Sequence, residues 1–169
     1  MTARHYEETT TVAATPAEVF AYLDDPARLA GHMGKSSWMM GGGRMAVSVD
    51  EGKGQKVGSH IRLDGIAFGL RVFLDEVVTK REAPFEKQWQ TVGAHRLLVI
   101  GDYTMGLKVE PVGPQSKLRI FIHYEMPREN AWLGTLFAGL YAKWCVGMML
   151  NDARAHFAAP QHGALKHAI

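Results

Sequence analysis

Alternation of apolar and polar residues dominates the middle of the chain. Apolar side chains recur at every second position, as in the run Met45, Val47 and Val49. Such spacing puts all the apolar side chains on one face of a β-strand. Glycine and proline turns separate the runs, and no helical spacing interrupts them. We therefore predict six antiparallel strands with short connections, over residues 45–50, 57–64, 70–79, 85–92, 97–109 and 117–126.

The residues before this region predict one more strand and two short helices. Residues 5–13 are rich in threonine and aromatic side chains, as strands are. Thr15–Glu18 is typical of a helix start, with threonine at the N-cap, proline first in the helix and a glutamate that can reach back. Asp25-Pro26 predicts a second start of the same kind.

The last part of the chain has helical spacing from about Ala131 to Ala158, with Asn130 as the expected N-cap. This helix is long enough to cross a whole domain. Trp132–Leu150 contains one charged residue, Lys143, whose cost at a bilayer centre is about 2.5–3.5 kcal/mol. We therefore predict a core helix and no membrane span. Its expected inward stripe is Leu133, Leu136, Phe137, Leu140, Trp144, Met148 and Asn151.

Length and charge narrow the class of protein. The 169 residues suit a single domain, predicted over 1–160, with a flexible tail over 161–169. Lysine and arginine number 19 against 17 acidic residues, a balance that argues against nucleic acid as a partner. The N-terminal residues show no signal-peptide core, so we expect a cytoplasmic protein.

The cysteine and histidine content predicts neither a metal site nor a cofactor. Cys145 is the single cysteine, which excludes an intramolecular disulfide and a site built on several thiolates. The eight histidines are scattered without the spacing of metal ligands. Gly41–Gly43 lacks the lysine and hydroxyl partners of a phosphate loop.

The order of these elements resembles that of a known superfamily. The residues that carry the likeness are Thr15–Phe20, Asp25-Pro26, Val57–Ser59, Glu82–Phe85 and Trp89. Over residues 5–158 the chain resembles the START-related helix-grip superfamily, which includes polyketide cyclase/dehydrase-like and Bet v 1-like proteins. The resemblance implies an α+β fold, in which a curved seven-stranded antiparallel sheet wraps a long C-terminal helix and two short helices follow the first strand. It also implies a cavity for a hydrophobic small molecule, but no shared catalytic signature.

The alternation of side chains along each strand predicts which residues face such a cavity. Lys87 falls on the apolar face of its strand with Phe85, Trp89 and Thr91, so it either reaches back to water or meets an acidic or phenolic ligand. Glu76 faces inward if Val72 and Leu74 do, and a Glu76–Lys87 pair would be an acid–base candidate. Glu8 is expected near the mouth. The predicted ligand-binding residues are Lys87, Trp89, Tyr103, Met105, Tyr124, Leu136, Leu140, Tyr141 and Trp144.

Three functions remain open at this point. The first is binding of a hydrophobic or aromatic small molecule, lipid-like or polyketide-like, beneath the long helix. The second is a cyclase/dehydratase-like enzyme in which a cavity tyrosine or the Lys/Glu pair moves protons, with no catalytic residue assigned. The third is a homodimeric domain that binds a protein partner and no small molecule. The sequence leaves open whether the chain is a monomer or a homodimer.

Overall fold

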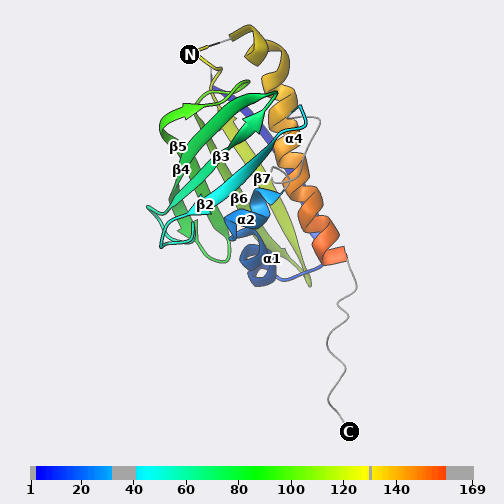
Figure 1. Ribbon diagram of the computed structural model, residues 1–169. Coiled ribbons are helices and arrows are strands. Elements are labelled where there is room, and N and C mark those ends of the chain that lie inside the picture. The colour runs from blue at the N-terminus through cyan, green and yellow to red at the C-terminus, as the bar shows by residue number, and fades with distance from the viewer. Residues whose placement is uncertain (1–2, 32–40, 130, 159–169) are drawn as a thin grey trace.

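A seven-stranded antiparallel sheet and one long helix make up most of the fold (Figure 1). The computed structural model describes residues 3–31, 41–129 and 131–158. The strand order is β1-β7-β6-β5-β4-β3-β2. The strands are β1 (Arg4–Val12), β2 (Arg44–Val49), β3 (His60–Ala67), β4 (Leu70–Glu82), β5 (Glu86–Arg96), β6 (Tyr103–Val112) and β7 (Gln115–Tyr124). The helices are α1 (Pro16–Leu23), α2 (Pro26–Leu29) and α4 (Ala131–Ala158).

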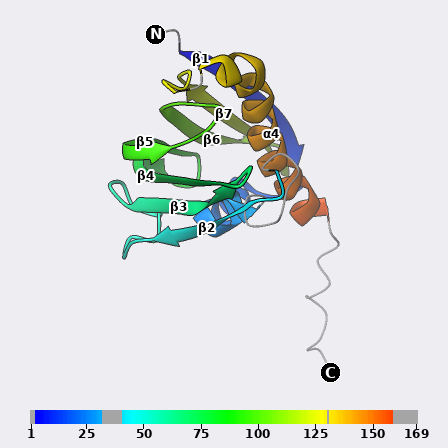
Figure 2. The same ribbon diagram turned by 45° about the horizontal axis from the view of Figure 1, so that its top comes forward.

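The sheet is strongly curved, and α4 crosses its open side (Figure 2). The first strand pairs with the last, so β1 and β2 become the two edges of the sheet. The two short helices connect these edges and lie at one end of the molecule (Figure 1). This arrangement confirms the predicted helix-grip architecture, including the two short helices after the first strand.

Both short helices begin as their sequences predict. The Thr15 side chain accepts from the backbone N–H of Glu18, whose carboxylate accepts from the Thr15 N–H at 2.8 Å. Asp25 accepts from the N–H of Ala27 at 2.9 Å. These caps direct Val19, Phe20 and Leu23 of α1 into the core.

The connection between β5 and β6 differs from the prediction. We expected a strand over 97–109, but β5 continues to Arg96 and β6 starts only at Tyr103. Each residue from Leu97 to Ile100 is at least half-buried. An alternating strand would have exposed two of these four apolar side chains, whereas a connection across the end of the core covers them all.

Alternation predicts the faces of β6 and β7 well, but not every residue of β5. Leu118, Ile120, Ile122 and Tyr124 are buried, as expected. Phe85 was expected to face inward and is 51% exposed, because it lies in the turn before β5, where its N–H donates to the backbone oxygen of Glu82. That part of the prediction is wrong.

The helix α4 turns a different face to the sheet from the one expected. Leu136 is 64% exposed and Leu140 50%, so the predicted stripe is wrong at these positions and neither side chain can line a cavity under the helix. Gly134, Ala138 and Ala142 allow close packing in the first half of the helix, and larger side chains are buried further along it. The buried residues are Gly134, Ala138, Ala142, Cys145, Val146, Met149, Leu150 and Ala153.

Two further sequence predictions concern this end of the chain. The expected N-cap Asn130 and the predicted tail over 161–169 lie outside the described residues. The helix α4 has an 18-residue window with a mean hydropathy of 1.3, of which 39% is buried. By length and composition this helix is apolar enough to cross a membrane, a test that the core helices of soluble proteins also pass.

The buried side chains form two clusters. One lies beneath α1 and α4 and includes Trp89, Met105 and Tyr124. The other lies on β2, β3 and β4 and includes Leu63 and Leu74. Leu97 and Tyr103 pack against both clusters. Side chains at this boundary are therefore candidates for a ligand site.

Candidate ligand-binding site

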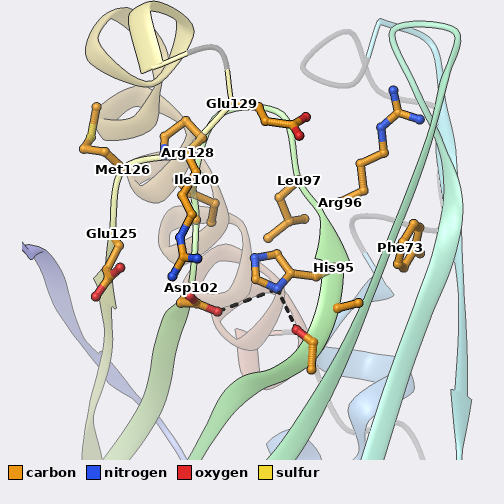
Figure 3. A pocket seen from close by; sticks show the side chains of 14 residues that line it. Phe73, His95, Arg96, Leu97, Ile100, Asp102, Glu125, Met126, Arg128 and Glu129 are labelled. Carbon is orange, nitrogen blue, oxygen red and sulfur yellow. Dashed lines mark hydrogen bonds and ion pairs between the residues drawn. The ribbon is translucent and has the colours of Figure 1, made fainter. Parts of the chain in front are cut away.

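Two hollows include residues of this boundary, since Tyr103 lines one of them and Leu97 the other. The inner one, here called the inner recess, has a volume of about 40 Å³. The larger one, the outer cavity, has about 510 Å³ at the end of the sheet near the start of α4 (Figure 3). The inner recess is lined by Pro26, Leu29, Ala30, Ile61, Leu63, Glu76, Trp89, Tyr103, Met105 and Met149.

A carboxyl group and a phenol meet in the inner recess. Glu76 extends from β4 and is 6% exposed, and the hydroxyl of Tyr103 on β6 donates a hydrogen bond to its carboxylate. The other residues around this pair are mostly apolar. A polar pair in such surroundings is costly to bury and can orient a ligand.

Burial raises the pKa of Glu76 to about 7, although hydrogen bonds from Tyr103 and Trp89 oppose the increase. Burial and the nearby Glu76 charge both raise the pKa of Tyr103 well above its ordinary value. Tyr103 therefore keeps its proton near neutral pH, while Glu76 can gain or lose one there.

The helix α4 adds two more titratable groups beside this pair. Burial raises the pKa of the Cys145 thiol to about 12, and a hydrogen bond with Tyr141 opposes this effect only in part. Burial likewise raises the pKa of Tyr141 well above its ordinary value. Cys145 is therefore a protonated thiol near neutral pH, without the thiolate that a nucleophile or metal ligand needs.

Lys87 is fully buried, and its ammonium group is held by Asp24. Lys87 Nζ lies 2.8 Å from Asp24 Oδ1 and 2.8 Å from the Asp24 backbone oxygen. Arg81 Nη2 lies 2.7 Å from the other oxygen of the same carboxylate. Lys87 therefore neither reaches back to water nor presents a free cation to a ligand. The Glu76–Lys87 pair, considered as an acid–base candidate if both faced inward, does not form a hydrogen bond in the described residues, and Asp24 is the partner of Lys87.

The pKa values of this buried pair follow from two opposing effects. Burial lowers the pKa of Lys87, and the Asp24 carboxylate opposes that change. Burial alone would raise the pKa of Asp24, but hydrogen bonds from Arg81 and Lys87 outweigh it, so this pKa is lowered. The three side chains join the end of α1 to β4 and β5, which is a structural role.

The other predicted ligand-binding residues are divided between the recess and its surroundings. Trp89 and Met105 line the inner recess. Tyr124 is buried in the cluster under α4. Tyr141 and Trp144 are half-buried on α4, with ring centroids 5.7 Å apart. Glu8 is partly exposed at the sheet edge, where it accepts from Tyr6 at 3.1 Å.

The outer cavity contains a histidine that the sequence did not single out. His95 Nδ1 on β5 lies 3.3 Å from the Gly93 carbonyl oxygen and 3.6 Å from Asp102 Oδ1 (Figure 3). The predicted strand ended at Val92, so the His95 side chain was not assigned to either face of the sheet. The remaining side chains are Phe73, Leu97, Ile100, Met126 and Pro127, which are apolar, and Arg96, Glu125, Arg128 and Glu129, which are charged.

No metal site is found in the part of the chain that the structure describes. Within residues 3–31, 41–129 and 131–158, no three His, Cys, Asp or Glu side chains lie close enough to hold an ion.

Solved structures with the same fold share little sequence with this chain. Norcoclaurine synthase from Thalictrum flavum, solved with dopamine and hydroxybenzaldehyde, has a TM-score of 0.66 at 15% identity, covering 96% of this chain and 90% of that one. Ara h 8.0201 has a TM-score of 0.65 at 12% identity, covering 93% and 99%. The protein TTHA0849 from Thermus thermophilus has a TM-score of 0.64 at 15% identity, covering 94% and 99%.

The family comparison is more direct. No curated protein matches the chain. The family model described as polyketide cyclase / dehydrase and lipid transport matches residues 3–155, nearly all of the helix-grip domain. The chain therefore belongs to the polyketide cyclase / dehydrase and lipid transport family, with the Bet v 1-like helix-grip fold.

Proposed function

We propose that this protein binds a small, mostly apolar or aromatic molecule between the sheet and α4, with one polar group of the ligand at Glu76 and Tyr103. The observation that carries the proposal is this buried carboxyl–phenol pair in an otherwise apolar recess. Protonated Glu76 would donate a hydrogen bond to a ligand carbonyl, and ionised Glu76 would accept one from a hydroxyl.

The dimensions of the two hollows limit how such a ligand sits. The inner recess of about 40 Å³ has room for a polar end group only, while about 510 Å³ is a typical volume for a small-molecule site. Asp102 lines the outer cavity and the next residue, Tyr103, lines the recess. We propose that the body of the ligand occupies the outer cavity and its polar end reaches past Leu97 to Glu76.

The family description supports a hydrophobic ligand. The neighbouring norcoclaurine synthase, solved with two aromatic molecules, shows that this fold accommodates such compounds. Its 15% identity carries no ligand over to this chain. Oligomeric state and a cytoplasmic location stay predictions.

A pair of matched probes tests the role of Glu76. 2-Acetylnaphthalene has a carbonyl, and 2-isopropylnaphthalene has a similar shape without it. We expect the chain to bind the ketone at least tenfold more tightly, since a hydrogen bond with a readily ionised group contributes about 1.5–3 kcal/mol. Competition against a fluorescent apolar dye measures both affinities.

Variants of the pair provide the control. Glu76→Gln and Tyr103→Phe should reduce the preference for the ketone. Tyr6→Phe should preserve it, because Tyr6 donates to Glu8 in the same kind of pair at the sheet edge. An unchanged preference in both recess variants, or equal binding of the two probes by the unmodified chain, would contradict the proposal.

A second candidate function is acid–base catalysis, favoured by the Glu76 pKa of about 7. A carboxylate there could remove a proton beside the carbonyl of a bound ketone, as cyclisation and dehydration chemistry requires. Exchange of the methyl protons of 2-acetylnaphthalene in heavy water, followed by NMR, measures this step. Glu76→Gln should slow the exchange about a hundredfold. Exchange no faster than in buffer alone would leave binding as the function.

A further inference from the structure

The contacts of His95 determine which of its ring nitrogens carries the proton. Nδ1 faces the Gly93 carbonyl oxygen at 3.3 Å and the Asp102 carboxylate at 3.6 Å. Both groups only accept hydrogen bonds, so Nδ1 is the nitrogen that carries hydrogen. In the neutral ring the lone pair is therefore on Nε2.

The second nitrogen is available to a ligand. The His95 side chain is 17% exposed and lines the outer cavity. Figure 3 shows one edge of its ring directed at Asp102 and Gly93 and the opposite edge directed into the cavity. Within the described residues, no hydrogen-bond partner of Nε2 is found. The cavity thus contains an oriented proton acceptor.

The walls of the cavity indicate what kind of molecule would meet this acceptor. Phe73, Leu97 and Ile100 suit an aromatic or apolar body. Arg96 and Arg128 have no ion-pair partner in the described part of the chain, while Glu125 and Glu129 line the same cavity. In Figure 3 the Arg128 guanidinium extends on the same side of the cavity as Asp102. The charged groups that line the cavity are thus two cations, Arg96 and Arg128, and three carboxylates, Asp102, Glu125 and Glu129.

We propose that His95, oriented by Asp102 and the Gly93 carbonyl, accepts a proton from a weakly acidic hydroxyl of an aromatic ligand, such as a phenol. The ligand O–H bond breaks, an N–H bond forms at Nε2, and the electron pair stays on the ligand oxygen. The resulting imidazolium lies against the Asp102 carboxylate, and the other charged groups facing it are Arg96, Glu125, Arg128 and Glu129. The proposal does not depend on the Glu76–Tyr103 pair.

The test uses 4-nitrophenol, whose absorbance changes when its hydroxyl loses the proton. Titration with the chain, at a pH where the free compound is mostly protonated, should give a saturable phenolate signal. His95→Gln should lose at least nine-tenths of that signal, and Asp102→Asn should weaken binding at least tenfold. The readout is ionisation of a bound phenol, whereas the function proposed above is tested by the preference for a ketone, so the two proposals can fail separately.

His60→Gln is the matched control. Its Nδ1 lies 3.0 Å from Asp75, so it forms the same kind of pair, but His60 lines neither hollow. This variant should give the same phenolate signal as the unmodified chain. A full phenolate signal in His95→Gln, or no phenolate signal with the unmodified chain, would overturn the proposal.

NMR of the imidazole nitrogens gives a second measurement that needs no ligand and no variant. It distinguishes the two neutral tautomers of each assigned ring. We expect neutral His95 to carry its proton on Nδ1. A proton on Nε2 would overturn the inference even if 4-nitrophenol binds.

Discussion

Glu76 carries its carboxyl group into the core, where ionisation is unfavourable. Its pKa of about 7 in the folded chain lies above the ordinary value of 4.5. Between these two values the folded chain binds a proton that the unfolded chain has released. The free energy of unfolding therefore falls as the pH rises through this window, and the stabilising contribution is fully present only below it.

Glu76→Gln should remove this pH dependence. As the pH rises from about 5 to about 8, the free energy of unfolding of the variant should increase by up to about 3 kcal/mol relative to that of the unmodified chain. Urea unfolding at both pH values measures the difference. Glu110→Gln, at an exposed position of β6, is the control and should follow the unmodified chain. Parallel pH profiles for all three proteins would contradict the raised pKa.

Asp24 neutralises a lysine that water does not reach. Asp24→Asn leaves the fully buried Lys87 without a carboxylate, so it should lower the free energy of unfolding by about 3–5 kcal/mol. Lys80→Met, which breaks a more exposed pair with Glu86, should cost about 1 kcal/mol or less. Urea denaturation measures both variants. Equal losses of stability in the two variants would mean that the Asp24 carboxylate contributes little to stabilising buried Lys87.

At the scale of single elements, the glycines of α4 have unequal surroundings. A Cβ on Gly134 would lie 2.4 Å from Pro127 Cδ and 2.8 Å from Cγ of the same rigid ring. A Cβ on Gly147 would meet nothing within 4 Å. The first glycine therefore serves close packing, and the second leaves free space beside the helix.

Alanine at these two positions should change stability in opposite directions. Gly147→Ala should stabilise the chain by up to about 1 kcal/mol, because alanine favours the helix and nothing opposes it. Gly134→Ala should destabilise it by about 1–3 kcal/mol through overpacking against Pro127. Thermal unfolding of the two single variants measures the difference. A loss of stability in both would show that α4 tolerates no side chain at Gly147.

At the scale of the whole molecule, the polar sequence of the last residues predicts a tail outside the helix-grip domain. We therefore expect deletion of residues 161–169 to change the free energy of unfolding by less than about 0.5 kcal/mol. Urea unfolding of the shortened chain measures this. A loss above about 2 kcal/mol would place the tail within the cooperative domain, contrary to the sequence prediction.

Features that depend on neighbours in the chain were predictable. The caps at Thr15 and Asp25 use residues within three positions of one another. The alternation in β6 and β7 gives the inward face of each strand because side chains alternate along any strand. Alternation also places Trp89 of β5 and Tyr103 and Met105 of β6 on inward faces, and all three line the recess. The superfamily and the α+β class thus follow from the sequence alone.

Features that depend on distant partners required the tertiary structure. Lys87 and Asp24 are 63 positions apart, and Tyr103 and Glu76 are 27 apart, so no local pattern pairs them. Both sides of α4 contain apolar residues, and only the folded chain shows which side is buried. Gly93 and Asp102 are only two and seven positions from His95, but their contacts with it depend on the connection between β5 and β6, where a strand was expected. The spacing of residues determines local structure. The partner of a buried charge depends instead on the distant groups that the folded chain brings beside it.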